Sequence, residues 1–144
     1  MKPVMSVDDL VAFMAHAFPQ VNGDFGVEAV TDDGVRMRLH VTDANLRPGG
    51  TVSGPSMFSL ADVGMYLATL SRIGPEALAV TTNCSIDFMR KPAANTDLIA
   101  EARLLKLGKS LSVGDVLIYS EGDPKPVARA SLTYSIPPKK GQRA

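Results

Sequence analysis

The sequence predicts an α+β fold in which a curved antiparallel sheet of about six strands wraps round one long central helix. Two observations lead to this class. Residues 57–73 are apolar almost all round, so the helix that they form must be buried rather than lie on a surface. Six other segments have the composition and alternation of strands. Because helices and sheets bury their apolar faces against each other, such a sheet is needed to enclose a single apolar helix.

The first element is a short amphipathic helix at residues 6–18. Ser6 can cap this helix, and the acidic pair that follows lies in the first turn, where the helix dipole favours negative charge. Apolar residues from Leu10 to Phe18 recur at helical spacing, and Pro19 ends the run.

Two strands follow, at residues 25–30 and 35–41. In the second strand apolar residues alternate with two arginines and a histidine, so one face of the sheet is apolar and the other is wet. Asp33-Gly34 favours a hairpin turn between them. We therefore expect an antiparallel pair with one covered face.

The central helix is expected to begin near Pro55, after a glycine-rich loop at residues 43–53. Proline is favoured in the first helical turn, and Ser53 or Gly54 can act as the cap. Gly74-Pro75 ends the helix.

Short segments rich in glycine, proline and asparagine separate four further strands, which are predicted at residues 79–88, 97–107, 111–119 and 127–136. The polar, basic tail at 137–144 is expected to fray. No internal repeat or linker interrupts the chain, so residues 1–144 are predicted to form a single domain.

Composition disfavours several classes of protein. Fifteen Lys and Arg balance fifteen Asp and Glu, so the chain lacks the basic excess of a general nucleic-acid binder. No stretch approaches the ~20 apolar residues of a membrane span, and the N-terminal segment lacks the apolar run of a signal peptide. Cys84 is the single cysteine, which fits a reducing compartment. We expect a cytoplasmic protein without nucleic-acid or membrane partners.

The charge is nevertheless uneven along the chain. Residues 1–62 carry four basic and eight acidic side chains, whereas residues 63–144 carry eleven basic and seven acidic ones. Lys and Arg side chains at the ends of adjacent predicted strands are either solvated or able to neutralise a phosphate group. These residues are Arg90, Lys91, Lys106 and Lys109.

Asp62 is the single charged residue between Gly54 and Ser71 in the apolar helix. Burying an unpaired carboxylate is costly, so this group needs partners or a shifted pKa. Two interpretations stay open: a structural carboxylate that is bound to a hydroxyl or a backbone N–H, or a catalytic base or nucleophile.

Gly54 brings a second group to the start of the same helix. Backbone N–H groups of a first helical turn have no intrahelical acceptor, and a glycine lets a ligand approach closely. Such a group can polarise an acyl carbonyl, although an ordinary capped helix start is the alternative. Eight residues separate Gly54 from Asp62, which is ~12 Å along a helix. If both groups are catalytic, Gly54 of one chain must therefore face Asp62 of another in a dimer.

Other chemistry finds less support in the sequence. His16 and His40 are isolated, with no further ligand at metal-site spacing, so no metal is expected. Ser53 lacks a base near it in sequence, and capping is the simpler role. A phosphate-binding loop is disfavoured because Pro55 stands where that motif needs lysine.

The segments GGTVSGPSMFSLAD (residues 49–62) and VTTNCSIDFMRKPA (residues 80–93) resemble the hotdog-fold acyl-CoA thioesterases of the phenylacetyl-CoA thioesterase type. The resemblance covers roughly residues 20–136 and implies a hotdog fold. It also implies that Asp62 attacks the thioester or activates water, that the Gly54 N–H polarises the thioester carbonyl, and that Thr81 helps to place water.

The same resemblance implies a homodimer, in some members a dimer of dimers, with coenzyme A as part of the substrate and no other cofactor. The nucleotide lies on the surface of such proteins, and pantetheine threads between subunits. The positions that match this surface are Arg90, Lys91, Lys106, Lys109 and Ser110.

Three positions depart from the motif of that family. The family usually reads Asn-x-x-Gly-x-x-His-Gly-Gly, whereas here Arg47 stands for the Asn, Ser53 for the His and Pro55 for the last Gly. Lost Asn and His contacts imply an altered substrate, slower hydrolysis or none.

The leading interpretation is hydrolysis of an acyl-CoA with a medium-chain or aromatic acyl group. Arg47 and Ser53 are expected beside the substrate, and the acyl group is expected among Met57, Phe58 and Met65, because methionine adapts to varied shapes. The alternative is a non-catalytic acyl-CoA or lipid-binding dimer. Acyl hydration is less favoured, because sites of that kind normally rely on a His that this helix entrance lacks.

Overall fold

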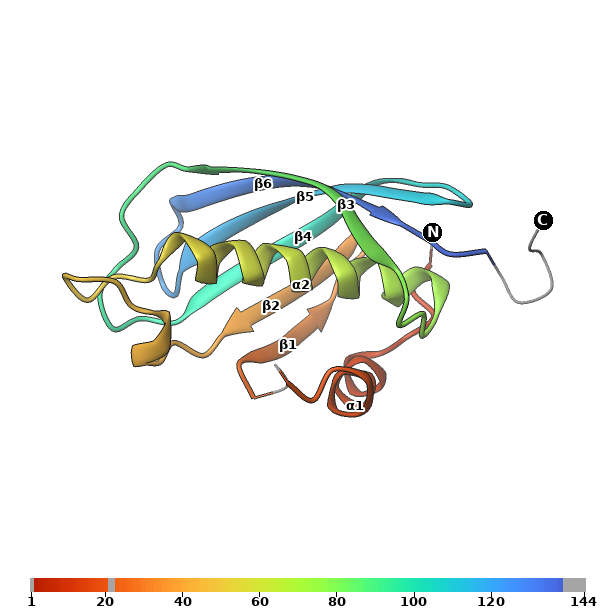
Figure 1. The fold of residues 1–144 in the computed structure, drawn as a ribbon, viewed down its shortest axis with the longest axis horizontal. Coiled ribbons are helices and arrows are strands. Elements are labelled where there is room, and N and C mark those ends of the chain that lie inside the picture. The colour runs from red at the N-terminus through yellow and green to blue at the C-terminus, as the bar shows by residue number, and fades with distance from the viewer. Residues whose placement is uncertain (1, 21–22, 139–144) are drawn as a thin grey trace.

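The protein is described by a computed structural model that covers residues 2–20 and 23–138. A curved six-stranded antiparallel sheet wraps round the long helix α2 (Gly54–Ile73), and the shorter helix α1 (Val7–Ala17) lies beside it (Figure 1). The strands are β1 (Phe25–Val30), β2 (Gly34–Leu39), β3 (Val80–Phe88), β4 (Leu98–Leu107), β5 (Leu111–Ser120) and β6 (Pro126–Ser135). The predicted fold class is confirmed. Residues 139–144 of the predicted frayed tail lie outside the described residues.

The strands are arranged in the order β1-β2-β4-β5-β6-β3, and every neighbouring pair is antiparallel. Strand β3 therefore lies next to β6, not next to β4, which follows it in the chain. The two edges differ. Helix α1 lies beside β1 (Figure 1), whereas β3 forms the opposite edge, with Val80 and Phe88 more than half exposed.

Helix α2 begins and ends where the sequence predicts. Ser53 is its N-cap and accepts a hydrogen bond from the Ser56 N–H at 3.3 Å, and Gly74 closes its other end. Most of its residues from Met57 to Arg72 are buried. A Cβ atom at Gly114 of β5 would clash with the Arg103 backbone carbonyl of β4 and would lie 2.7 Å from the Met65 sulfur, so glycine is needed at this point of the sheet.

Local hydrogen bonds determine a short turn and two element ends that the pattern of apolar residues does not predict. A 3₁₀ turn at Asp43–Asn45 interrupts the predicted loop, because the Asn45 carboxamide oxygen accepts from the Thr42 N–H at 2.8 Å. Strand β2 ends at Leu39, earlier than predicted, and the Val41 N–H instead donates to Asp97 at 3.0 Å. Helix α1 carries the expected Ser6 cap, which is reinforced by Asp9.

Salt bridges connect charged side chains on the outer face of the sheet. Arg38 binds Glu28, Asp97 and Glu121 there, and Arg36 binds Glu28 and Glu101. Within residues 2–20 and 23–138, no helix is long and apolar enough to cross a membrane.

Candidate functional site

Asp62 lies near the middle of α2, half-buried, and faces the strands at the β3 edge of the sheet. Its Oδ1 accepts hydrogen bonds from the Thr81 hydroxyl at 2.6 Å and from the Tyr134 hydroxyl at 2.7 Å. The Tyr134 hydroxyl also lies 3.0 Å from the Asp62 carbonyl oxygen. Among the described residues, Oδ2 has no hydrogen-bond partner. One carboxylate oxygen is therefore held by two hydroxyls while the other is available for chemistry.

The groups around Asp62 keep their protons. Burial, and then the charge of Asp62, raise the pKa of Tyr134, so its hydroxyl stays a donor at neutral pH. Burial and the same charge raise the pKa of the Cys84 thiol. Cys84 is thus a poor nucleophile, because the reactive form of cysteine is the thiolate.

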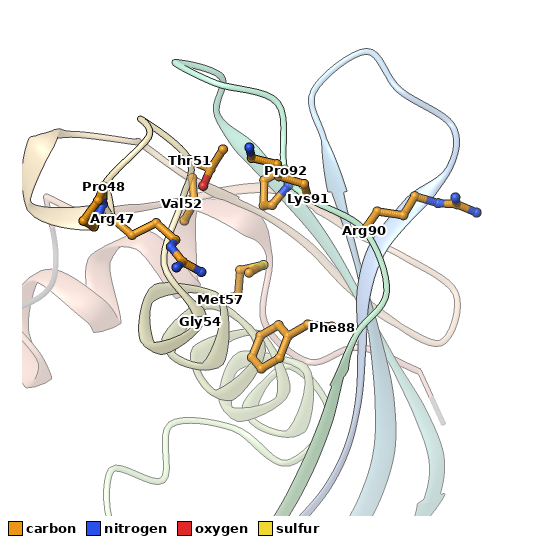
Figure 2. Close-up of a pocket in the computed structure, with 10 residues that line it drawn as sticks. All are labelled: Arg47, Pro48, Thr51, Val52, Gly54, Met57, Phe88, Arg90, Lys91 and Pro92. Atoms are coloured by element: carbon orange, nitrogen blue, oxygen red, sulfur yellow. The ribbon is translucent and has the colours of Figure 1, made fainter.

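The second part of the candidate site is a cavity of about 550 Å³ at the N-terminus of α2, where Gly54 lies (Figure 2). Its lining combines apolar residues with three cationic ones, and no carboxylate is among the described residues that line it. The lining residues include Val52, Gly54, Met57, Phe88 and Pro92, with Arg47, Arg90 and Lys91 as the cations. Together with the positive end of the helix dipole, these cations favour an anionic ligand that has an apolar part.

Gly54 is the first residue of α2, and the Phe88 ring lies over it. A Cβ atom at Gly54 would lie 3.2 Å from the Phe88 ring, so the absence of a side chain lets the ring come close. No loop carbonyl among the described residues accepts from the Gly54 N–H. That N–H is available to a ligand carbonyl, because a first-turn N–H has no acceptor within the helix.

The loop that carries Arg47 is closed by its own backbone. Leu46 and Val52 form a β-bridge, and the Arg47 N–H donates to the Thr51 carbonyl at 2.9 Å. Gly49 and Gly50 at the tip have φ values of 99° and 81°, which residues other than glycine rarely adopt. Arg47 therefore lies on a short loop that is held by its own hydrogen bonds. We call residues 46–52 the Arg47 loop.

The predicted site residues fall into separate groups. Asp62 and Thr81 are in contact, whereas Gly54 and Met57 lie at the cavity with Arg47, Arg90 and Lys91. Ser53 is occupied as the cap of α2, where its hydroxyl also bonds the Ser56 hydroxyl at 3.1 Å.

Two predicted acyl contacts lie elsewhere. Phe58 is 40% exposed and does not line the cavity. Met65 is fully buried and packs against Gly114 of the sheet, so it belongs to the core of the subunit.

The predicted cationic surface is divided within one chain. Arg90 and Lys91 follow the end of β3, whereas Lys106, Lys109 and Ser110 lie at the β4–β5 hairpin. That hairpin is near the start of β3, since Leu111 pairs with Ser135 and Ser135 with Val80. Nine strand residues, or roughly 30 Å, separate the two groups. The expectation that these residues end adjacent strands is thus corrected by the strand order.

The hairpin has a cavity of its own. A space of about 770 Å³ at the C-terminal end of α2 is lined by Lys109 and Ser110 together with Ile73, Pro75 and Glu76. It lies at the opposite end of α2 from the cavity at Gly54.

Tyr134 and Phe88 are the contributors that the sequence interpretation missed. The alternation of β6 puts Tyr134 on the same face as Leu132 and Ala130, and a buried tyrosine hydroxyl needs a partner. This alternation predicts that the Tyr134 side chain points into the core, but it does not predict that β6 places this side chain against Asp62. Within the described part of the chain, no three His, Cys, Asp or Glu side chains are arranged to hold a metal ion.

The chain is similar to known proteins in sequence and in fold. A family model described as the Thioesterase superfamily matches residues 49–127. A crystal structure of a presumed thioesterase from Silicibacter sp. TM1040 is 56% identical, with a TM-score of 0.90 over 96% of each chain. Comparison with curated proteins gave no match.

Two phenylacetic acid degradation proteins are more distant. The PaaI protein of Thermus thermophilus, in a mutant form, is 26% identical with a TM-score of 0.71, over 83% of this chain and 99% of that one. The PaaI protein of E. coli is 25% identical with a TM-score of 0.72, over 88% of this chain and 94% of that one.

Proposed function

Because the chain belongs to the thioesterase superfamily, we propose that it hydrolyses acyl-CoA thioesters, with Asp62 as the catalytic carboxylate. The observation that carries the proposal is the carboxylate itself. Two hydroxyls hold Oδ1 of Asp62 at 2.6 and 2.7 Å and leave Oδ2 without a hydrogen-bond partner among the described residues. Because Asp62 is only half-buried, this free oxygen can reach a water molecule or a bound substrate.

The active site needs two copies of the chain. Gly54 and Asp62 are ~12 Å apart along α2, whereas reacting groups must meet within about 3.5 Å. We infer that the copies pair through β3, a nine-residue edge with exposed apolar residues at both ends. An isologous antiparallel pair places the end of one β3 beside the start of the other.

This pairing joins the two halves of the site. In each chain Phe88, near the end of β3, contacts Gly54, while Thr81, near its start, binds Asp62. Directly opposite residues of antiparallel strands point to the same face, so the two-fold axis passes close to a residue in the middle of β3. With Cys84 or Ser85 at the axis, Gly54 of one copy approaches Asp62 of the partner subunit, and the dimer has two equivalent sites.

The same pairing reunites the divided cations. Arg90 and Lys91 of one copy approach the β4–β5 hairpin of the other, with its Lys109 and Ser110. The assembled surface suits the phosphates of coenzyme A, which bind Lys and Arg through charge-assisted hydrogen bonds. The acyl group lies at the cavity beside Met57, whose flexible side chain suits a medium-chain or aromatic group.

The reaction is thioester hydrolysis by water. Oδ2 of Asp62 removes a proton from water, whose oxygen adds to the thioester carbonyl, and the Gly54 N–H of the other copy stabilises the oxyanion that forms. The carbon–sulfur bond then breaks, and the proton goes to the sulfur, which leaves as the free thiol of coenzyme A. Thr81 and Tyr134 keep the carboxylate oriented. If single turnover in ¹⁸O-water labels Asp62 itself, this residue attacks the carbonyl directly instead.

Release of free thiol tests the function. Wild-type protein is expected to cleave hexanoyl-CoA or phenylacetyl-CoA, and Asp62→Asn is expected to lower the rate about a hundredfold or more. Size-exclusion chromatography of the variant should still give the wild-type particle. Binding of an acyl-CoA by the wild type with no thiol release would favour the non-catalytic dimer.

A mixing experiment tests the shared site. Asp62→Asn and Gly54→Ala impair different halves of the site, so a mixed dimer keeps one intact site and has one site that is impaired in both halves. After dissociation and random reassembly in equal amounts, roughly a quarter of the wild-type activity should return. If reassembled mixtures stay inactive, the two groups do not act across a subunit boundary.

A further inference from the structure

We propose that Arg47 selects acyl groups that end in a carboxylate, so that the preferred substrate is the monothioester of a dicarboxylic acid. The inference rests on the proposed thioester hydrolysis and names its substrate class. It starts from the arginines of the described chain, most of which have partners of their own.

Five of these arginines bind protein oxygens. Arg36, Arg38, Arg103 and Arg129 form salt bridges with Asp or Glu, and buried Arg72 donates to the Thr31 and Gly34 carbonyls. Within residues 2–20 and 23–138, the side chains of Arg47 and Arg90 form no hydrogen bond or salt bridge, and both line the cavity at the N-terminus of α2. A cavity that has an unpaired guanidinium group beside it, and no carboxylate among its described lining residues, favours an anionic ligand.

The two arginines point in different directions. Figure 2 shows Arg47 extending from its loop toward Met57 and Gly54, whereas Arg90 points away from the cavity. Arg90 therefore suits the outer surface, where the phosphates of coenzyme A are expected. Arg47 suits a group beside the thioester, because the Gly54 N–H is the proposed partner of the thioester carbonyl.

The chemistry of the substrate identifies that group. The pantetheine arm next to the thioester sulfur is neutral, and the phosphates lie beyond its length. An anion close to the thioester carbonyl must therefore belong to the acyl side. The apolar part of the wall, formed by Val52, Met57 and Phe88, fits the methylene chain that joins the thioester to a terminal carboxylate.

Arg47 is also well presented for this role. The Arg47 N–H donates to the Thr51 carbonyl, and its own carbonyl accepts from the Gly50 N–H at 3.0 Å. Thr51 is only 5% exposed, which anchors the loop. A planar guanidinium on such a loop can bind a carboxylate through two parallel hydrogen bonds.

Matched thioesters of N-acetylcysteamine, which lack phosphates, test the proposal. Wild-type protein is expected to hydrolyse the adipoyl thioester with a kcat/KM about tenfold above that of the hexanoyl thioester, as a hydrogen-bonded charge pair would give. The monomethyl ester of the adipoyl compound, equal in length but neutral, should behave like hexanoyl. Arg47→Gln should lose about tenfold on adipoyl and stay within about twofold on hexanoyl. Arg103→Gln, which removes an exposed arginine on the outer face, is the control and should keep the preference.

The outcomes separate this proposal from the proposed function. Hydrolysis of hexanoyl and adipoyl thioesters at equal rates overturns the role of Arg47 but leaves the thioesterase intact. An effect of Arg47→Gln that is seen with CoA esters and disappears with N-acetylcysteamine thioesters assigns Arg47 to a phosphate and also overturns it. If no thioester is cleaved, the proposed function fails, and calorimetry with the non-cleavable amide analogues then tests the role of Arg47 alone. Tighter binding of the adipoyl than of the hexanoyl analogue by the wild type, with this difference lost in Arg47→Gln, supports that role. Equal binding of the two analogues refutes it.

Discussion

The hydroxyl of Tyr134 lies 2.7 Å from Oδ1 of Asp62, although the two residues are 72 positions apart in the chain. Together with Thr81 it fixes one oxygen of a half-buried carboxylate and leaves the other available. This arrangement and the surfaces around it lead to four predictions.

Tyr134→Phe removes one donor and leaves the ring that packs in the core. We expect kcat to fall about tenfold, the equivalent of one hydrogen bond to a charged group, with KM little changed. Steady-state thiol release measures both constants. Tyr119→Phe, on neighbouring β5, is the control and should keep wild-type kinetics. An equal loss in both variants would show that the effect is not specific to the carboxylate.

Gly54→Ala places a Cβ atom 3.2 Å from the Phe88 ring, which must then move. The ring is half exposed, so we expect a folded protein whose kcat/KM has dropped about a hundredfold through misplacement of the thioester. Gly64→Ala is the control in the same helix, because its Cβ atom would make ordinary contacts at 3.6 and 3.7 Å. Wild-type activity of Gly54→Ala would contradict the expected misplacement of the thioester at the start of α2.

Ser85→Cys tests the pairing of β3. In a Cys84→Ser background, an oxidant should produce a covalent dimer, because opposite residues near a two-fold axis have Cβ atoms about 5 Å apart. A non-reducing gel detects the product. Ser131→Cys is the matched control: Ser131 pairs with Ser85 but lies on β6, one strand in from the edge. Cross-linking of both variants alike would argue for random collisions rather than for β3 pairing.

The free energy of unfolding should fall in acid because Arg38 forms salt bridges with Glu28, Asp97 and Glu121. Hydrogen bonds from Arg38 lower the pKa of Glu28 and Glu121, and the pKa of Asp97 is lowered by the Val41 N–H and then by Arg38. Depressed carboxyl pKa values stabilise the folded state above the unfolded values of 4.5 for Glu and 3.8 for Asp, and this contribution is lost as pH falls through the folded values.

Arg38→Met should therefore lower the urea midpoint at neutral pH and flatten its fall between about pH 5 and pH 3. Arg129→Met, which removes an isolated exposed pair with Asp87, is the control and should keep the wild-type slope. Parallel pH profiles of wild type and Arg38→Met would contradict the prediction.

Periodicity predicted the elements well because apolar residues recur at 2 or 3.6 positions wherever one face is buried. It could not predict the 3₁₀ turn at Asp43–Asn45, which depends on a side-chain hydrogen bond. Helix α2 is apolar on nearly every side, so the sequence does not distinguish Met57 at the cavity from Met65 in the core. The contact of Tyr134 with Asp62 follows from strand order, and pairing partners are not encoded locally.

The Arg47 loop closes on itself through the Leu46 to Val52 bridge, while the carboxylate stands on α2, well inside the sheet. Folding therefore places little constraint on which residue occupies the position of Arg47. If Arg47 binds the acyl group as we propose, selection can alter the choice of acyl group there without disturbing the proposed catalytic carboxylate. This separation lets related chains change their substrate specificity with little effect on the stability of the fold.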